Sequence, residues 1–342
     1  MTNVHNVLYI TTQGAWLRKD HETVLVRVER QNRLAIPLHH LEGIVCFGRV
    51  NVTPNLLGAC ATRGISLSFL TETGRFLGRV EGPVSGNVLL RRSQYRRADD
   101  AEASARLAKS FLLGKLGNAR VLLLRSAREQ AEPSDGPLGR AAARISEHLR
   151  ELGLAEGLDS IRGVEGRAAA TYFGVFDRLI RRQKEDFSFS GRTRRPPRDP
   201  MNALLSFLYA LLRRDAESAL GAVGLDPQVG YLHVDRPGRP SLGLDLMEEL
   251  RPALADRLAV GLVNLAQVKA RGFDASATGA VSMNEATRKE VLVAYQKRKQ
   301  ESLRHPFTDS TIPLSLVVHV QARLLARVIR GDLADYPPFV SR

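Results

Sequence analysis

One short stretch of the sequence gathers residues that could hold a metal ion. Residues 230–252 read GYLHVDRPGRPSLGLDLMEELRP, and His233 there precedes a basic turn broken by prolines. Three acids follow within about one helical turn: Asp245, Glu248 and Glu249. Like charges at spacings of three and four residues repel one another unless a cation lies between them. The pattern therefore indicates a cation site, and its structural alternative is a solvated acidic face beside a core histidine.

A further acid, Glu165, lies in the segment RGVEGRAAATYFG, at the start of a predicted helix rich in alanine. Small neighbours allow another helix to approach this carboxylate, although an exposed glutamate is the ordinary alternative. An imidazole with carboxylates and no thiolate suits Mn²⁺ or Mg²⁺ better than structural zinc. Such an ion could neutralise a phosphodiester, orient an attacking hydroxyl or water and stabilise the leaving oxygen.

A basic loop and the helix after it supply candidate DNA contacts. The segment SGRTRRPPRDP at 190–200 cannot be helical across its prolines, and its arginines suit phosphate oxygens: Arg192, Arg194, Arg195 and Arg198. The following helix carries polar residues every three or four positions, so that one stripe could face the site: Asn202, Ser206 and Tyr209. Solvated arginines and a tyrosine that merely packs are the alternatives.

Composition favours a polyanionic partner. The 342 residues include 50 Lys and Arg against 36 Asp and Glu, which gives a formal net charge of +14 and a pI near 10.3. Nucleic acid is the leading candidate for a chain of this charge. Its two cysteines, Cys46 and Cys60, cannot build a disulfide framework. We expect a cytoplasmic protein, because no apolar run approaches the roughly 20 residues that span a membrane and the N-terminus lacks the features of a signal peptide.

The order of patterns predicts an α+β protein with a small β-rich N-terminal domain and a larger all-helical catalytic domain. Residues 1–85 alternate short β-branched segments with turns, and one helix is expected between Pro54 and Gly64. Residues 86–342 show apolar residues three and four apart. Helices are predicted over 95–130, 138–152, 160–184, 200–221, 241–268, 283–304 and 312–330, with a mobile loop at 269–284.

Ordered motifs along the whole chain resemble a known family. They are VSGNVLLRRSQYRR, GVEG, FSGRTRRPPRDPMNALLSFLYALL, GLDPQVGYLH and RPSLGLDLMEELRP. Their order and distances are similar to those of the CRISPR-associated spacer integrases, the Cas-one proteins of the adaptation complex. The resemblance implies a metal-dependent DNA endonuclease and integrase, which joins captured double-stranded DNA fragments to a CRISPR repeat by transesterification. It also implies a homodimer, formed in our interpretation through residues 1–85, that pairs with a small CRISPR-associated partner.

The resemblance also implies the metal ligands, which by motif fall on Glu165, His233 and Glu248. Many members carry aspartate where this chain has Glu248, and we assign Asp245 an auxiliary role beside it. Two rival hypotheses remain open at this point. One is a basic, non-catalytic DNA scaffold whose acids only form salt bridges, and the other is an RNA-directed metal nuclease.

Overall fold

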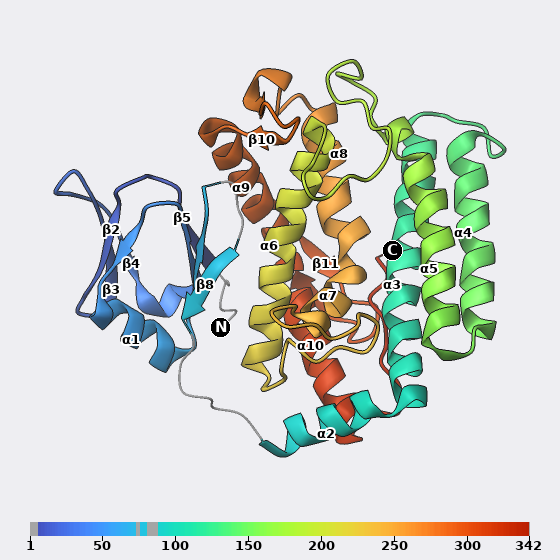
Figure 1. Cartoon of the computed structure of the whole chain (residues 1–342), viewed down its shortest axis with the longest axis horizontal. Coiled ribbons are helices and arrows are strands. Elements are labelled where there is room, and N and C mark those ends of the chain that lie inside the picture. The colour runs from blue at the N-terminus through green and yellow to red at the C-terminus, as the bar shows by residue number, and fades with distance from the viewer. Residues whose placement is uncertain (1–5, 73–75, 81–87, 342) are drawn as a thin grey trace. The chain divides into compact units, whose positions relative to one another are not determined.

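The chain divides into two compact units. A computed structural model describes residues 6–72, 76–80 and 88–341. The smaller unit comprises residues 1–85 with 283–296, and the larger comprises 86–282 with 297–342. Together they form the predicted α+β fold, in which a β-strand region precedes a larger helical region (Figure 1). The assignment of dimerisation to residues 1–85 remains a prediction.

Two four-stranded sheets make up the described part of the smaller unit. Their strand orders are β1-β5-β7-β8 and β4-β3-β2-β6. In the first sheet β5 pairs in parallel with β1 and β7, and β8 pairs antiparallel to β7. The bounds are β1 Asn6–Ile10, β2 Trp16–Asp20, β3 Thr23–Val28, β4 Gln31–Pro37, β5 Leu41–Phe47, β6 Asn51–Val52, β7 Ser66–Leu70 and β8 Phe76–Val80.

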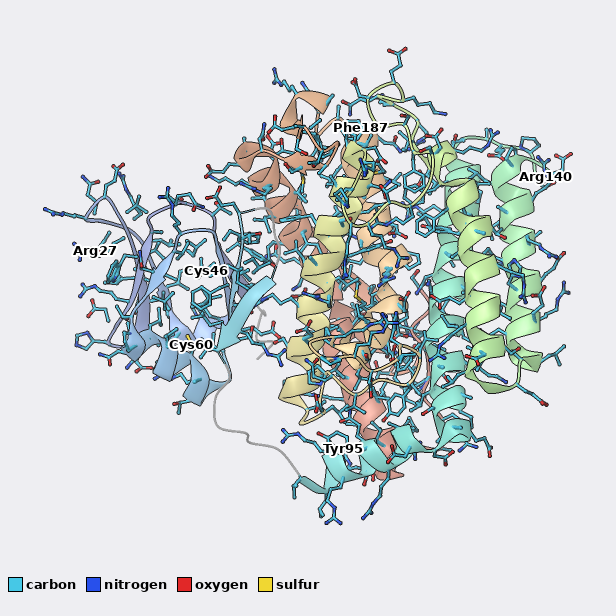
Figure 2. The ribbon with its side chains drawn as sticks, in the orientation of Figure 1. Arg27, Cys46, Cys60, Tyr95, Arg140 and Phe187 are labelled. Atoms are coloured by element: carbon cyan, nitrogen blue, oxygen red, sulfur yellow. The ribbon has the colours of Figure 1, made fainter. Side chains whose placement is uncertain are left out.

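The core of the smaller unit lies among these strands and one helix. Helix α1, Pro54–Arg63, begins with proline and ends at Gly64, whose left-handed backbone (φ 68°) favours glycine, as the sequence predicts. Leu17, Ile44, Leu56, Leu67 and other apolar side chains are fully buried between the strands and α1. The cysteines are free and buried, and Figure 2 shows both within this unit.

Helices dominate the larger unit. In Figure 1 helices α3, α4 and α5 run side by side, and their mutual packing is the most extensive in this unit. Figure 2 shows Arg140 on the outer side of α4. The bounds are α2 Val88–Asp99, α3 Ala101–Glu129, α4 Pro137–Leu154, α5 Gly157–Gly174, α6 Pro200–Ala222, α7 Ser241–Glu248, α8 Arg257–Asn264 and α10 Leu314–Arg330, while α9 (Glu285–Gln300) spans the division between the units.

Four predicted helices are shorter or interrupted, and the one over 283–304 is helical only from Glu285 to Gln300, with a strand at Ser302–Arg304. The one over 95–130 is divided at Asp100, whose carboxylate caps α3 by accepting hydrogen bonds from two backbone N–H groups. The one over 160–184 ends at Gly174. The one over 241–268 is interrupted after Glu248, where a π-helical turn, Arg251–Asp256, accommodates Pro252 before α8 begins.

The second domain is helical as predicted, but it also contains short strands that the sequence did not indicate. Short strands β9 Phe273–Ala275 and β10 Val281–Met283 pair across the segment predicted to be a mobile loop, and β11 Ser302–Arg304 pairs with β12 Thr311–Pro313. Each strand has only three residues, too few for an alternating pattern to appear in the sequence. No helix among the described residues is long and apolar enough to cross a membrane.

Candidate metal-binding active site

A lysine lies between two of the predicted metal ligands. Lys115, on α3, donates a hydrogen bond from Nζ to Oε1 of Glu165 on α5 at 2.7 Å. The same Nζ is 2.9 Å from Oε2 of Glu248, the last residue of α7. The three side chains are 16%, 24% and 1% exposed, in that order. Helices α3, α5 and α7 thus bring two carboxylates to one ammonium group.

Glu248 is the more buried of the two carboxylates, and the groups that contact it are cations. Arg251, in the π-helical turn, places Nη1 2.9 Å from Glu248 Oε1. Burial opposes the charged carboxylate, but Arg251 and Lys115 outweigh it and lower the pKa of Glu248 to about 2. Neither Glu248 oxygen accepts a well-directed hydrogen bond from the described residues. Its charge is therefore balanced by ion contacts and not by directional bonds.

His233 is oriented toward Glu248 by Asp245. Its Nδ1 lies 2.6 Å from Asp245 Oδ1, and its Nε2 lies 3.8 Å from Glu248 Oε1. With Nδ1 donating to the carboxylate, Nε2 is the nitrogen left with a lone pair. Asp245 also accepts the backbone N–H groups of Tyr231, Leu232 and His233, at 2.7 to 3.0 Å. Asp245 thus fixes both the loop and the ring.

The sequence places Glu249 beside these acids, but the structure turns it away. Its carboxylate accepts hydrogen bonds from the Tyr336 hydroxyl, from Gln321 Nε2 at 3.1 Å and from Phe339 N–H at 2.6 Å. Burial raises its pKa to about 7. On α3, a Cβ added at Gly114 would lie 2.6 Å from the Cβ of Glu249, so glycine lets α3 and α7 approach closely. Glu249 therefore ties α7 to the C-terminal segment.

The predicted ligands lie close to one another, but their donor atoms do not converge on a single metal position. Among the described residues, no three His, Cys, Asp or Glu side chains lie in position to hold a metal ion directly. Glu165 and Glu248 both contact Lys115, and His233 Nε2 lies 3.8 Å from Glu248 Oε1. The assignment of Glu165, His233 and Glu248 as ligands stays a prediction, and the structure shows that they are neighbours.

A further buried carboxylate, that of Asp256, is hydrogen-bonded to two tyrosines near Arg251. Asp256 accepts hydrogen bonds from the hydroxyls of Tyr209 at 2.6 Å and Tyr172 at 2.9 Å. Burial raises the pKa of Asp256 to about 6, against the lowering effects of the tyrosine hydrogen bonds and of Arg251 and Arg192. The guanidinium of Arg251 lies 4.9 Å from the centre of the Tyr209 ring. Tyr209 therefore packs against Arg251, the side chain that contacts Glu248.

The polar stripe on α6 anchors the basic loop. Arg192 donates hydrogen bonds to Asn202 Oδ1 at 2.6 Å and to Ser206 Oγ at 3.0 Å. Asn202 in turn donates to Gly191 O at 2.7 Å. The other predicted phosphate ligands are exposed: Arg194, Arg195 and Arg198. The exposed arginines remain candidates for DNA contacts, whereas Arg192 is half-buried and engaged in holding the loop.

Reasoning from the sequence did not find Lys115, Arg251 or Asp256. Lys115 is a single cation within the apolar run SFLLGKLG, and this was the available signal, because an isolated charge in such a run needs a partner. Arg251 was hidden by the predicted continuous helix. Asp256 gave no signal, since its tyrosine partners lie 47 and 84 residues away in the chain.

Comparison with known proteins identifies the family of this chain. Residues 8–297 match the family model described as CRISPR associated protein Cas1. The chain belongs to this family, as the motifs indicated. It is 51% identical to the CRISPR-associated endonuclease Cas1 1 of Chlorobaculum tepidum, over 98% of both chains, and 50% identical to Cas1 2 of Rhodospirillum rubrum, over 99% of both.

Solved structures share the fold. A Cas1 protein from Thermotoga maritima aligns with a TM-score of 0.81 at 22% identity, covering 98% of this chain and 100% of that one. A casposase bound to integration product aligns with a TM-score of 0.82 at 22% identity, covering 97% and 93%. A chain of a Cas6-RT-Cas1–Cas2 complex aligns with a TM-score of 0.81 at 22% identity, covering 99% of this chain and 36% of that one.

Proposed function

We propose that this protein is a metal-dependent DNA endonuclease and integrase, which inserts captured DNA fragments into a CRISPR array by transesterification. The observation that carries the proposal is the meeting of Glu165 and Glu248 at a single cation, with His233 beside them. Membership of the Cas1 family and the likeness in fold to a casposase bound to integration product support it. DNA and a small CRISPR-associated protein are the proposed partners, and the fold shared with the Cas1–Cas2 complex agrees with the second.

The side chains fit a divalent ion. Both oxygens of Glu248 are buried and face the cations Lys115 and Arg251, so the carboxylate is in the charged form that a metal ligand needs. The Lys115 ammonium already stands where these carboxylates attract positive charge. Glu165, His233 Nε2 and Glu248 would hold Mn²⁺ or Mg²⁺ there, and the bound ion would neutralise charge on a phosphodiester and activate the attacking hydroxyl.

The surrounding residues prepare this chemistry. Asp245 holds His233 with Nε2 free and directed toward Glu248. Arg251 keeps Glu248 ionised, and Tyr209 packs against the Arg251 guanidinium. The exposed arginines of residues 194–198 are the proposed contacts for DNA phosphates, and they would position the strand for the reaction at the metal.

A second candidate, the non-catalytic DNA scaffold, also has an observation in its favour. The ion contacts of Glu165 and Glu248 with Lys115 and Arg251 are the salt bridges that this alternative requires. The two candidates differ in what a divalent ion does. The scaffold should bind DNA without metal and convert nothing, whereas the enzyme should need metal for turnover.

The test is a strand-joining assay. Purified protein is mixed with its small CRISPR-associated partner, a DNA fragment with free 3′-hydroxyl ends and a repeat-containing DNA, in Mn²⁺ and in EDTA. We expect joined product in the Mn²⁺ reaction and none in the EDTA reaction. A Glu165→Gln variant should give no product in either. Equal DNA binding in both media with no product would support the scaffold instead. An RNA substrate run in parallel addresses the RNA-directed alternative.

A further inference from the structure

The location of Lys115 raises a question that metal binding alone does not answer. Its ammonium is 2.7 Å from Glu165 Oε1 and 2.9 Å from Glu248 Oε2, which are the oxygens expected to take a metal. A divalent ion bound to the same two oxygens would lie a few ångströms from the ammonium group, and like charges at that distance repel strongly in a buried site. We therefore expect metal binding to move the Lys115 ammonium away.

We propose that Lys115 is an internal counter-ion, which occupies the metal site in the metal-free protein and competes with the divalent ion for Glu165 and Glu248. The inference rests on the proposed function, since it assumes that a metal binds these acids. In this role Lys115 neutralises Glu165 and Glu248 when no metal is bound, and it raises the Kd of the site for a divalent ion.

The packing around Lys115 explains why it can act in this way. Its side chain starts from α3 beside Gly114, where α3 and α7 approach closely, and it is 16% exposed. The carboxylates of Glu165 and Glu248, at 2.7 Å and 2.9 Å from its ammonium group, balance the charge of this largely buried side chain. Without this ammonium, Glu165 would lose its ion pair with Lys115, while Glu248 would keep its contact with Arg251.

The lysine also has an unbranched, flexible side chain that can swing away without moving α3. Arginine at the same position would hold a carboxylate with a rigid, two-pronged group and would be harder to displace. A point charge on a flexible stem is the kind of counter-ion that can be exchanged for a metal ion.

The experiment measures Mn²⁺ affinity directly, in the absence of DNA. Mn²⁺ is titrated calorimetrically into the wild type and into Lys115→Met, which keeps the apolar stem and removes the charge. Lys109→Met is the matched control, because Lys109 lies on the same helix and donates to Gly153 O at 3.2 Å. We expect the Kd of Lys115→Met for Mn²⁺ to be at least about tenfold lower than that of wild type, equivalent to about 1.4 kcal/mol. The control should match wild type.

Other results separate the inference from the proposed function. Unchanged or weaker Mn²⁺ binding by Lys115→Met, with measurable binding by wild type, would overturn the counter-ion role and leave the proposed metal site standing. No binding by any of the three proteins would overturn both. If Lys115→Met binds Mn²⁺ and the other two proteins do not, the inference is supported, because the wild-type affinity is then too weak to measure and the variant affinity is higher.

Folding is followed by circular dichroism in EDTA and in Mn²⁺, with Lys115→Gln as a second variant that retains a hydrogen-bond donor. A variant that folds only when Mn²⁺ is present supports the role, because the ion then replaces the missing charge. If both variants stay unfolded in both media, Lys115 is a structural requirement of the fold and the counter-ion role is wrong.

Discussion

Asp256 offers a quantitative test of the network behind the site. Burial raises its pKa from the ordinary value of 3.8 to about 6, although Tyr209 and Tyr172 donate to its carboxylate. Because the folded-state pKa lies above the unfolded-state value, the folded protein binds the proton more tightly. The group therefore stabilises the fold fully below about pH 3.8, and this contribution is lost as the pH rises through about 6. The shift corresponds to about 3 kcal/mol.

The perturbation is Asp256→Asn, which removes the titration and keeps the shape. Urea unfolding of both proteins from about pH 4 to pH 7.5 gives the free energy of unfolding at each pH. The wild-type value minus the variant value should fall by about 2.4 kcal/mol over this range, mostly between pH 4 and pH 6, because the unfolded-state carboxyl is already more than half ionised at pH 4. Asp159→Asn, at a side chain that is 99% exposed, is the control for loss of a surface carboxylate. A difference that stays constant or rises with pH would refute the reasoning.

Three further predictions concern the site, the loop and the smaller unit. Glu248→Gln should lower the free energy of unfolding by about 3–5 kcal/mol, because it leaves buried cations undercompensated, yet in EDTA it should bind DNA at least as tightly while losing joining in Mn²⁺; full joining would mean that Glu248 is not a ligand. Replacing Arg194 and Arg195 with alanine should flatten the slope of log affinity against log salt by about one to two units, and an unchanged slope would return them to the solvated loop. Deleting residues 1–85 should abolish the dimer in sedimentation, once soluble expression is verified, and a shortened chain that still dimerises would contradict that assignment.

Local patterns predicted much of the fold. The β-branched segments before residue 85 and the helical periodicity after it specify the two kinds of structure, because each depends on neighbours within one or two turns. The break at Leu250 to Pro252 was missed. The acidic and apolar residues on both sides of Pro252 keep a helical spacing, so the sequence shows no sign of an interruption. The π-helical turn accommodates the proline, and helical structure continues after it.

The candidate site was predictable where it depends on motifs and not where it depends on packing. The motifs pointed to Glu165 and Glu248, and the structure brings both to Lys115. Lys115 itself comes from a helix 50 residues before Glu165, so that only the tertiary fold joins them. Helical spacing also grouped Glu249 with Glu248, but adjacent residues on a helix point about 100° apart, and Glu249 faces the C-terminal segment.

Because these two adjacent acids point in different directions, the C-terminal segment that holds Glu249 also supports the site at Glu248. Tyr336 and Phe339 hold Glu249 from one side, while Asn118, one turn of α3 after Lys115, donates to the backbone oxygens of Glu249 at 2.7 Å and Phe339 at 2.8 Å. A chain shortened before Tyr336 would lose these donors and loosen the seam between α3 and α7 that aligns Lys115 with Glu248. If trimming this end abolishes activity, the cause would therefore be a change in the positions of the active-site residues. For the same reason, an affinity tag is better fused elsewhere.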